Sequence, residues 1–289
     1  MRARLDEVVT HYLEKGMAVP ALTAYNFSTA AAVVSAAEDR GRAAILLVAP
    51  NTAVDPDGMR LIRALRGLAD SASVPVSIQL DHAKSLPLIT AAVGAGVDAV
   101  LADGSHLALA DNIAFVRAVA DECAGAGIVV EAELGAIGGD EDRADAAPAR
   151  SAGGLVDPDI ARTFVERTGA RLLAPSVGNV HGTYRGEPTL HWDLIENLRA
   201  SLSVPLVMHG ASGLPVADIQ RAIRCGFGKV NINTELRAVV LAELERVVPD
   251  ARRAGLDVLA VERNHRETVW QFTQSAFTTL DARAQKDTE

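Results

Sequence analysis

The residues best suited to chemistry in this chain stand at the ends of apolar segments. Four of its seven histidines close or follow segments typical of buried strands, as in SIQLDH and VPLVMHG. Two carboxylates, in LADGSH and IVVEAELG, have the same placement. The six positions are His82, His106, His181, His209, Asp103 and Glu133. Imidazole and carboxylate ligands delivered from successive strand ends are what a catalytic metal on a parallel barrel requires.

The elements that must position these side chains alternate along the chain. Strands are expected at Ala18–Ala24, Ala43–Ala49, Val74–Leu80, Asp98–Ala102, Gly127–Glu133, Ala170–Val177, Val204–His209 and Gly228–Asn231. Helices are expected between them, for example at Pro56–Asp70, Leu86–Ala95, Asn112–Ala124, Asp157–Thr168, Asp193–Ser201 and Pro215–Cys225. Such strands do not simply alternate in polarity, which indicates a parallel sheet buried on both faces.

Right-handed crossovers leave two architectures, an open doubly wound sheet and a closed barrel. Eight repeated units favour the α/β class as a single (β/α)8 TIM barrel over residues 1–289. We expect an N-terminal amphipathic helix and one extra C-terminal helix over Val258–Arg283. The Gly-, Ala- and charge-rich segment 138–155 is expected to be a mobile active-site loop.

The composition and net charge of the chain exclude several classes of function. The net charge of −9 argues against nucleic acid or a membrane surface as a partner, so an anionic substrate needs a local positive site. Cys123 and Cys225 show no CxxC spacing and are expected to be reduced thiols. No apolar run reaches the length of a transmembrane segment or resembles a signal peptide. We therefore expect a cytoplasmic protein.

Three of the histidines could share one ion, because the carboxyl ends of barrel strands face one mouth. His82, His181 and His209 with one open position would match a catalytic zinc site. Glu133 and Asp103 would lie at the same mouth, either as metal ligands or as carboxylates that orient an imidazole.

Other motifs suggest anion binding and proton transfer. HGTYRG (181–186), HGASG (209–213) and NINT (231–234) stand where late strands meet helices, the usual phosphate position in barrels. Ser105 or His106 in DGSH could instead cap a helix. Asp81 could reach the cavity beside the metal or cap a helix near Ser85, and Glu141 could close over the substrate or remain solvated.

With these residues in view, the chain resembles the class II, metal-dependent fructose-/tagatose-bisphosphate aldolases, and most closely the tagatose-bisphosphate branch. The resemblance runs from about Lys15 to the final helix. It is carried by AYN (24–26), QLDH (79–82), DGSH (103–106), EAELG with GGDED (131–142), GNVHGTYRGEP (178–188), HGASGLP (209–215) and KVNINTEL (229–236). The resemblance implies a carbon–carbon lyase of carbohydrate metabolism and glycolysis that acts on a phosphorylated sugar.

The resemblance also implies roles for individual residues. His82, His181 and His209 match the zinc ligands, Glu133 and Asp103 match carboxylates for a second or alternative metal position, and Asp81 and Glu141 match the proton-transfer groups. The cradle for dihydroxyacetone phosphate would comprise Asn26, Gly182, Gly210, Ala211, Ser212, Asn231, Asn233 and Thr234. A monovalent cation beside this cradle and a homodimer or homotetramer are further expectations from the resemblance alone.

Two departures leave the substrate open. Ala49 in VAPNTA stands where relatives carry a hydroxyl, and Arg263 and Arg266 are the candidates for the basic residue near a distal phosphate. The aldolase could therefore act on a bisphosphate or on a monophosphate such as a deoxy-keto-gluconate phosphate. A zinc hydrolase and a non-catalytic sugar-phosphate-binding paralogue are the alternatives. The hydrolase is disfavoured because Tyr25 and Asn26 replace the expected HxH pair.

Overall fold

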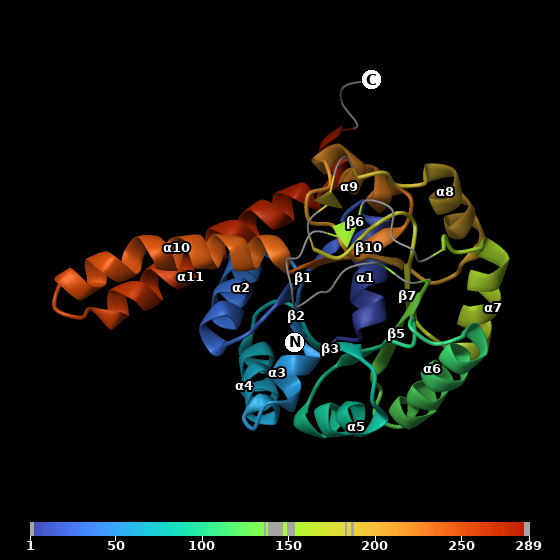
Figure 1. Ribbon diagram of the computed structural model, residues 1–289, viewed down its shortest axis with the longest axis horizontal. Helices are drawn as coiled ribbons and strands as arrows, with labels where there is room; N and C mark the ends of the chain where they lie inside the picture. Colours follow the sequence, from blue (N-terminus) through green and yellow to red (C-terminus); the bar gives the residue numbers. More distant parts are fainter. Residues whose placement is uncertain are drawn as a thin grey trace.

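A computed structural model describes residues 3–135, 137, 147–148, 154–182, 184–185 and 188–285. Within these residues, eight parallel strands close a barrel in the order β1-β10-β9-β7-β5-β4-β3-β2 (Figure 1). The barrel strands are β1 (Val19–Thr23), β2 (Ala44–Val48), β3 (Val76–Ala83), β4 (Ala99–Ala102), β5 (Val129–Leu134), β7 (Leu172–Pro175), β9 (Leu206–Met208) and β10 (Phe227–Ile232). The predicted TIM barrel is confirmed.

Most helices follow a strand and cover the outside of the barrel, whereas the first helix precedes β1 (Figure 1). The helices are α1 (Leu5–Glu14), α2 (Phe27–Arg40), α3 (Pro50–Val54), α4 (Gly58–Ser71), α5 (Leu86–Ala95), α6 (Leu109–Ala124), α7 (Pro158–Thr168), α8 (Trp192–Ser201), α9 (Val216–Arg224), α10 (Thr234–Arg253) and α11 (Val258–Thr279). Helix α10, which contains Pro249 in its last turns, was not predicted from the sequence.

Each barrel strand is buried on both faces, and successive residues serve different cores. Ile45 and Leu47 of β2 face the barrel interior, where they join Val129 of β5. Leu46 and Val48 face outward and pack with the surrounding helices. This two-sided burial explains why the strands are continuous apolar runs in the sequence.

Helix α1 closes the barrel at the amino ends of the strands. Its residues Leu5 and Val9 belong to the interior core cluster. Gly228 at the start of β10 leaves room for the helix, because a Cβ there would lie 2.7 Å from a methyl group of Val9. The closure leaves the carboxyl ends of the strands as the mouth where a site can form.

Helices α10 and α11 form a hairpin that extends away from the barrel (Figure 1). Helix α11 packs along α2 as well as α10. The single helix expected over Val258–Arg283 ends at Thr279, and a 3-10 turn follows at Ala282–Gln285.

The segment between β5 and α7 contains one described strand, β6 (Ala147–Pro148), which pairs in parallel with β8 (Tyr184–Arg185). Most of the predicted active-site loop 138–155 lies outside the described residues, so its mobility stays a prediction. Across the described part of the chain, no helix combines the length and the apolar character needed to cross a membrane.

Candidate metal centre and active site

Four side chains converge at the mouth of the barrel. One ligand atom from each of His82, Glu133, His181 and His209 lies within 4.8 Å of the other three. Ligand atoms about 2.1 Å from a tetrahedral zinc ion lie about 3.4 Å from one another, so an inward shift of the side chains by roughly 1 Å would let all four bind one ion. The buried Oε2 of Glu133 accepts no hydrogen bond from the described residues, as expected of an atom reserved for a cation. Three imidazoles and a carboxylate therefore fit a divalent metal.

His82 reaches this cluster through an irregularity in β3. The register between β3 and β4 shifts between Leu80 and Ala83, and His82 has a φ of 41°, which is unusual for a residue with a side chain. Without this distortion, His82 would point to the face opposite Asp81.

His181 lies in the loop after β7. Its ring is buried, and its Nε2 lies 3.4 Å from Nδ1 of His209. Burial, reinforced by the neighbouring His82, lowers the pKa of His181 to about 3. The ring is therefore neutral at physiological pH, which is the state that binds a metal.

His209 follows β9 and is fully buried between two carboxylates. Its Nε2 lies 3.0 Å from Oε1 of Glu131, and its Nδ1 lies 3.3 Å from Oε2 of Glu133. Burial would lower the pKa of His209, but its hydrogen bond to Glu131 and its close contact with Glu133 outweigh burial and raise the pKa to about 9. Asn179 holds the adjacent backbone by donating a 2.9 Å hydrogen bond to the carbonyl of His209.

Asp103 orients His82 and lies outside the four-residue cluster. Its Oδ2 is 3.1 Å from Nδ1 of His82, and its Oδ1 accepts hydrogen bonds from the backbone and hydroxyl of Ser105. Burial would raise the pKa of Asp103, but the hydrogen bond to His82 and those from Ser105 hold it well below its usual range. Neither Ser105 nor His106 caps α6, whose N-cap residue is Ala108.

Asp81 is buried at the edge of the metal cluster. The Nδ2 atom of Asn231 lies 3.4 Å from each carboxylate oxygen of Asp81. Asp81 and Asn233 line the same cavity of about 580 Å³ as three residues of the metal cluster. The alternative role of Asp81 as a helix cap is not observed, because it lies within β3 and Ser85 is the N-cap residue of α5.

The residues predicted to hold phosphate lie around the later strands but have additional roles. The hydroxyl of Ser212 and the backbone N–H of Gly213 donate to the carboxylate of Glu235, at 2.6 and 3.0 Å. Gly210 has a φ of 63°, and a Cβ there would lie 2.0 Å from the carbonyl oxygen of Val180. Glycine is therefore required for this close approach of the backbone, whereas phosphate binding stays a prediction.

The remaining cradle residues divide into two groups. Asn231, Asn233 and Gly182 lie at the barrel mouth, since Asn231 contacts the metal cluster and Gly182 follows His181. Asn26, in contrast, uses its side-chain oxygen to cap α2 by accepting from the backbone N–H of Thr29 at 2.8 Å. Ala211 is buried two residues after His209, and Thr234 is the first residue of α10. Glu141 lies outside the described residues, and its role stays a prediction.

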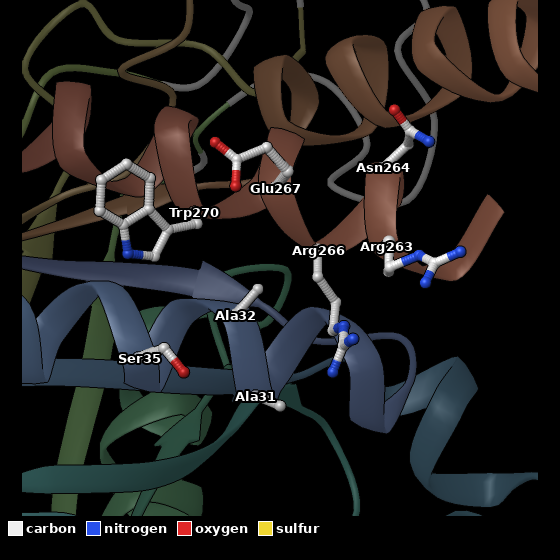
Figure 2. Close-up of a pocket in the computed structure, with 8 residues that line it drawn as sticks. All are labelled: Ala31, Ala32, Ser35, Arg263, Asn264, Arg266, Glu267 and Trp270. Atoms are coloured by element: carbon white, nitrogen blue, oxygen red, sulfur yellow. The ribbon is translucent and has the colours of Figure 1, made fainter. Parts of the chain in front are cut away.

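Arg263 and Arg266 line a second cavity rather than the metal site. This cavity of about 540 Å³ lies between α2 and α11, and Figure 2 shows Arg266 extending from α11 towards α2. Its other lining residues include Ser35 and Trp270, and none of them also lines the metal-site cavity. Neither arginine reaches the metal site of its own chain in this arrangement, so neither serves there as the distal-phosphate contact.

A buried polar layer, not predicted from the sequence, lies beneath the metal cluster. Glu131 accepts hydrogen bonds from Lys229 at 2.8 Å and from Gln79 at 2.9 Å, and all three side chains are fully buried. Burial would raise the pKa of Glu131, but the charge of Lys229 and the contact with His209 lower it to about 2. The sequence feature that could have predicted this layer is the two-residue spacing of Glu131 and Glu133, which places both on the interior face of β5.

The barrel fold and the cluster of imidazoles and carboxylate at its mouth define a class of proteins, the metal-dependent enzymes built on a TIM barrel. Comparison with known families is more specific, because the model of the class-II fructose-bisphosphate aldolases matches residues 3–285. The chain belongs to the class-II fructose-bisphosphate aldolase family. It is therefore a metal-dependent aldolase, a carbon–carbon lyase.

Solved structures agree with this assignment. The YdjI aldolase from Escherichia coli K12 is 29% identical, with a TM-score of 0.86 and coverage of 98% of both chains. A candidate fructose-1,6-bisphosphate aldolase from Coccidioides immitis is 27% identical, with a TM-score of 0.87 and coverage of 96% of both chains. Fructose-bisphosphate aldolase from Campylobacter jejuni, at 21% identity and a TM-score of 0.81 over 96% of this chain and 94% of that chain, shares the fold.

Proposed function

We propose that the protein is a zinc-dependent aldolase that reversibly cleaves a ketose bisphosphate, such as fructose or tagatose 1,6-bisphosphate. The products would be dihydroxyacetone phosphate and glyceraldehyde 3-phosphate. One observation carries the proposal: the three imidazoles and Glu133 converge within 4.8 Å, and His82, Glu133 and His181 line the same cavity as the buried carboxylate of Asp81. Nitrogen-rich sites of this kind suit zinc better than the oxygen-binding magnesium or calcium.

A bound zinc ion would act as a Lewis acid that polarises the ketose carbonyl and stabilises negative charge as the carbon–carbon bond breaks. The residues that would hold it are His82, Glu133, His181 and His209.

The chain's own carboxylates would move the protons. Asp81 would take the hydroxyl proton of the departing aldehyde during cleavage and return it during condensation, since it lies in the cavity. Glu141 would transfer a proton at the carbon of dihydroxyacetone phosphate that forms the new bond. No lysine is needed to form a Schiff base.

A monophosphorylated ketose is the alternative substrate. Two observations favour it: Ala49 lines the cavity without a hydroxyl, and the two candidate arginines lie in a separate cavity. Lys84 also lines the metal-site cavity, with its Nζ 3.7 Å from Oδ2 of Asp103. A substrate whose aldehyde half carries a smaller anionic group would need fewer positively charged side chains in the cavity.

The experiment is a coupled assay for dihydroxyacetone phosphate release from fructose bisphosphate, tagatose bisphosphate and monophosphate ketoses. Each substrate is tested with and without a zinc chelator, and zinc is then restored. Activity that disappears with chelator and returns with zinc supports the proposal. Full turnover in chelator contradicts the zinc mechanism, and zinc binding without turnover on the whole panel supports a sugar-phosphate-binding paralogue.

We also propose a homodimer or homotetramer. Support comes from apolar side chains exposed on the α10–α11 hairpin, Leu241, Leu256, Val258 and Leu259. A second copy of the chain would cover part of this surface. Light scattering after size-exclusion chromatography tests this, and a monomer at micromolar concentration contradicts it. A cytoplasmic location and a monovalent cation beside the phosphate cradle stay predictions.

A further inference from the structure

A charged pair lies inside the barrel directly below the metal cluster. The Nζ atom of Lys229 is 2.8 Å from Oε2 of Glu131, and both side chains are completely buried. Replacing a buried ion pair with apolar side chains of similar size is often neutral or stabilising, so stability alone does not explain this pair. Its contacts point to the metal site instead.

One contact joins Glu131 to the ring nitrogen of His209 that points away from the other three clustered residues. Oε1 of Glu131 lies 3.0 Å from Nε2 of His209. A carboxylate paired with an ammonium group only accepts hydrogen bonds, so Nε2 of His209 must carry the proton. The other ring nitrogen, Nδ1, lies 3.3 Å from Oε2 of Glu133 and 3.4 Å from Nε2 of His181, on the metal side.

A competing hydrogen-bond donor lies near the same nitrogen and would favour the other tautomer of His209. Nδ2 of Asn231 lies 3.3 Å from Nε2 of His209 and could donate to it only if that nitrogen were unprotonated. Glu131 makes the shorter contact and carries a charge. Charge-assisted hydrogen bonds are roughly twice as strong as neutral ones, so Glu131 decides the tautomer.

Lys229 also reaches the proton-transfer side of the site. Its Nζ donates to Oδ1 of Asn231 at 2.7 Å, which fixes the orientation of that amide. The Nδ2 atom of Asn231 then faces both carboxylate oxygens of Asp81 at 3.4 Å. One ammonium group is therefore connected to a metal ligand and to the acid–base carboxylate.

We propose that Lys229 and Glu131 are positioning residues that hold His209 in the tautomer that binds the metal through Nδ1. Lys229 keeps Glu131 in place and charged, Glu131 accepts from Nε2, and Nδ1 presents its lone pair to the ion. The same Lys229 aligns Asn231 beside Asp81. This inference rests on the proposed zinc site and adds how the chain prepares one ligand of it.

The first test uses the native protein. Zinc-loaded protein with 15N-labelled histidine rings is compared with a His209→Asn variant, which identifies the signals of His209. The expected result is a protonated Nε2 and a metal-bound Nδ1. A metal-bound Nε2 on His209 would overturn the proposal without any change to the buried pair.

The second test measures zinc affinity by competition with a coloured chelator. Removing either charge alone could prevent folding, so both are replaced together. Glu131→Leu with Lys229→Met removes the acceptor, and Glu131→Gln with Lys229→Met retains a neutral acceptor. We expect zinc to bind about 10- to 100-fold more weakly in the first double variant, with an intermediate loss in the second.

The control is Arg66→Met, which breaks another largely buried ion pair, with Asp98, outside the barrel mouth. It should lower stability and leave zinc affinity unchanged. Native zinc affinity in the folded Glu131→Leu double variant, or equal losses in both double variants, would overturn the proposal. If the native protein binds no zinc, the proposed function fails instead, so the two failures are distinguishable.

Discussion

Asp81 and His82 are consecutive in the chain, yet both side chains line the same cavity at the barrel mouth. Neighbours on a regular strand point to opposite faces. The register shift in β3 and the φ of 41° at His82 remove this constraint. Such backbone strain costs roughly 1–3 kcal/mol, and it places an imidazole of the four-residue cluster beside the carboxylate that we propose to transfer protons.

His209→Ala should remove metal binding and activity together. The substitution deletes one of four converging ligands and leaves Glu131 and Glu133 without their shared imidazole. We expect zinc affinity to fall by at least about 100-fold, measured as zinc content after dialysis against a weak chelator. A variant that retains one zinc per chain would show that His209 is not a ligand.

Asp81→Asn should separate binding from proton transfer. The amide keeps the size of the carboxylate but cannot exchange the proton, so kcat should fall by about 10²- to 10⁴-fold. Zinc content should stay native, because Asp81 is not one of the four clustered ligands. Equal kcat values for the variant and the native enzyme would exclude Asp81 as the acid–base group.

Glu141→Ala should affect a different step. We expect native zinc content but slower exchange of deuterium into dihydroxyacetone phosphate in the absence of aldehyde, by about 10²-fold or more. The neighbouring Asp142→Ala serves as a matched loop control and should exchange at the native rate. Unchanged exchange in Glu141→Ala would mean that another group is the base.

Asp6→Asn should reveal how the closed end of the barrel depends on pH. Asp6 accepts hydrogen bonds from Arg4 and Arg171, joining α1 to the start of β7. Burial would raise the pKa of Asp6, but these hydrogen bonds lower it. At pH 7 the free energy of unfolding should be about 1 kcal/mol lower for the variant than for the native protein. The difference is modest because both arginines are partly exposed.

The sign of the pH effect follows from the lowered pKa. The stabilisation by Asp6 is fully present above the unfolded pKa of about 3.9 and is lost as the pH falls through the folded pKa. Denaturant unfolding of both proteins at pH 7 and near pH 3 measures the difference. The difference in the free energy of unfolding should be smaller at the lower pH. A difference that does not change with pH would rule out ionisation of Asp6 as its source.

The barrel and the convergence of three histidines at its mouth were predictable from the sequence because both depend on local pattern. Apolar runs such as AILLV indicate strands buried on both faces, and parallel strands bring their carboxyl ends to one mouth. His82, His181 and His209 follow such runs, so their convergence followed from topology. Glu133 was predicted at the same mouth, but the sequence could not distinguish ligation from orientation.

Tertiary structure decided the features that depend on distance across the barrel. The pairing of Lys229 with Glu131, which are 98 residues apart, exists only because β10 and β5 face each other across the interior. The position of Asp103 behind His82 and the separation of Arg266 from the metal cavity are decided in the same way. A sequence pattern fixes which face of a strand a side chain occupies. Only packing fixes which charged group it meets there, because that partner comes from another part of the chain.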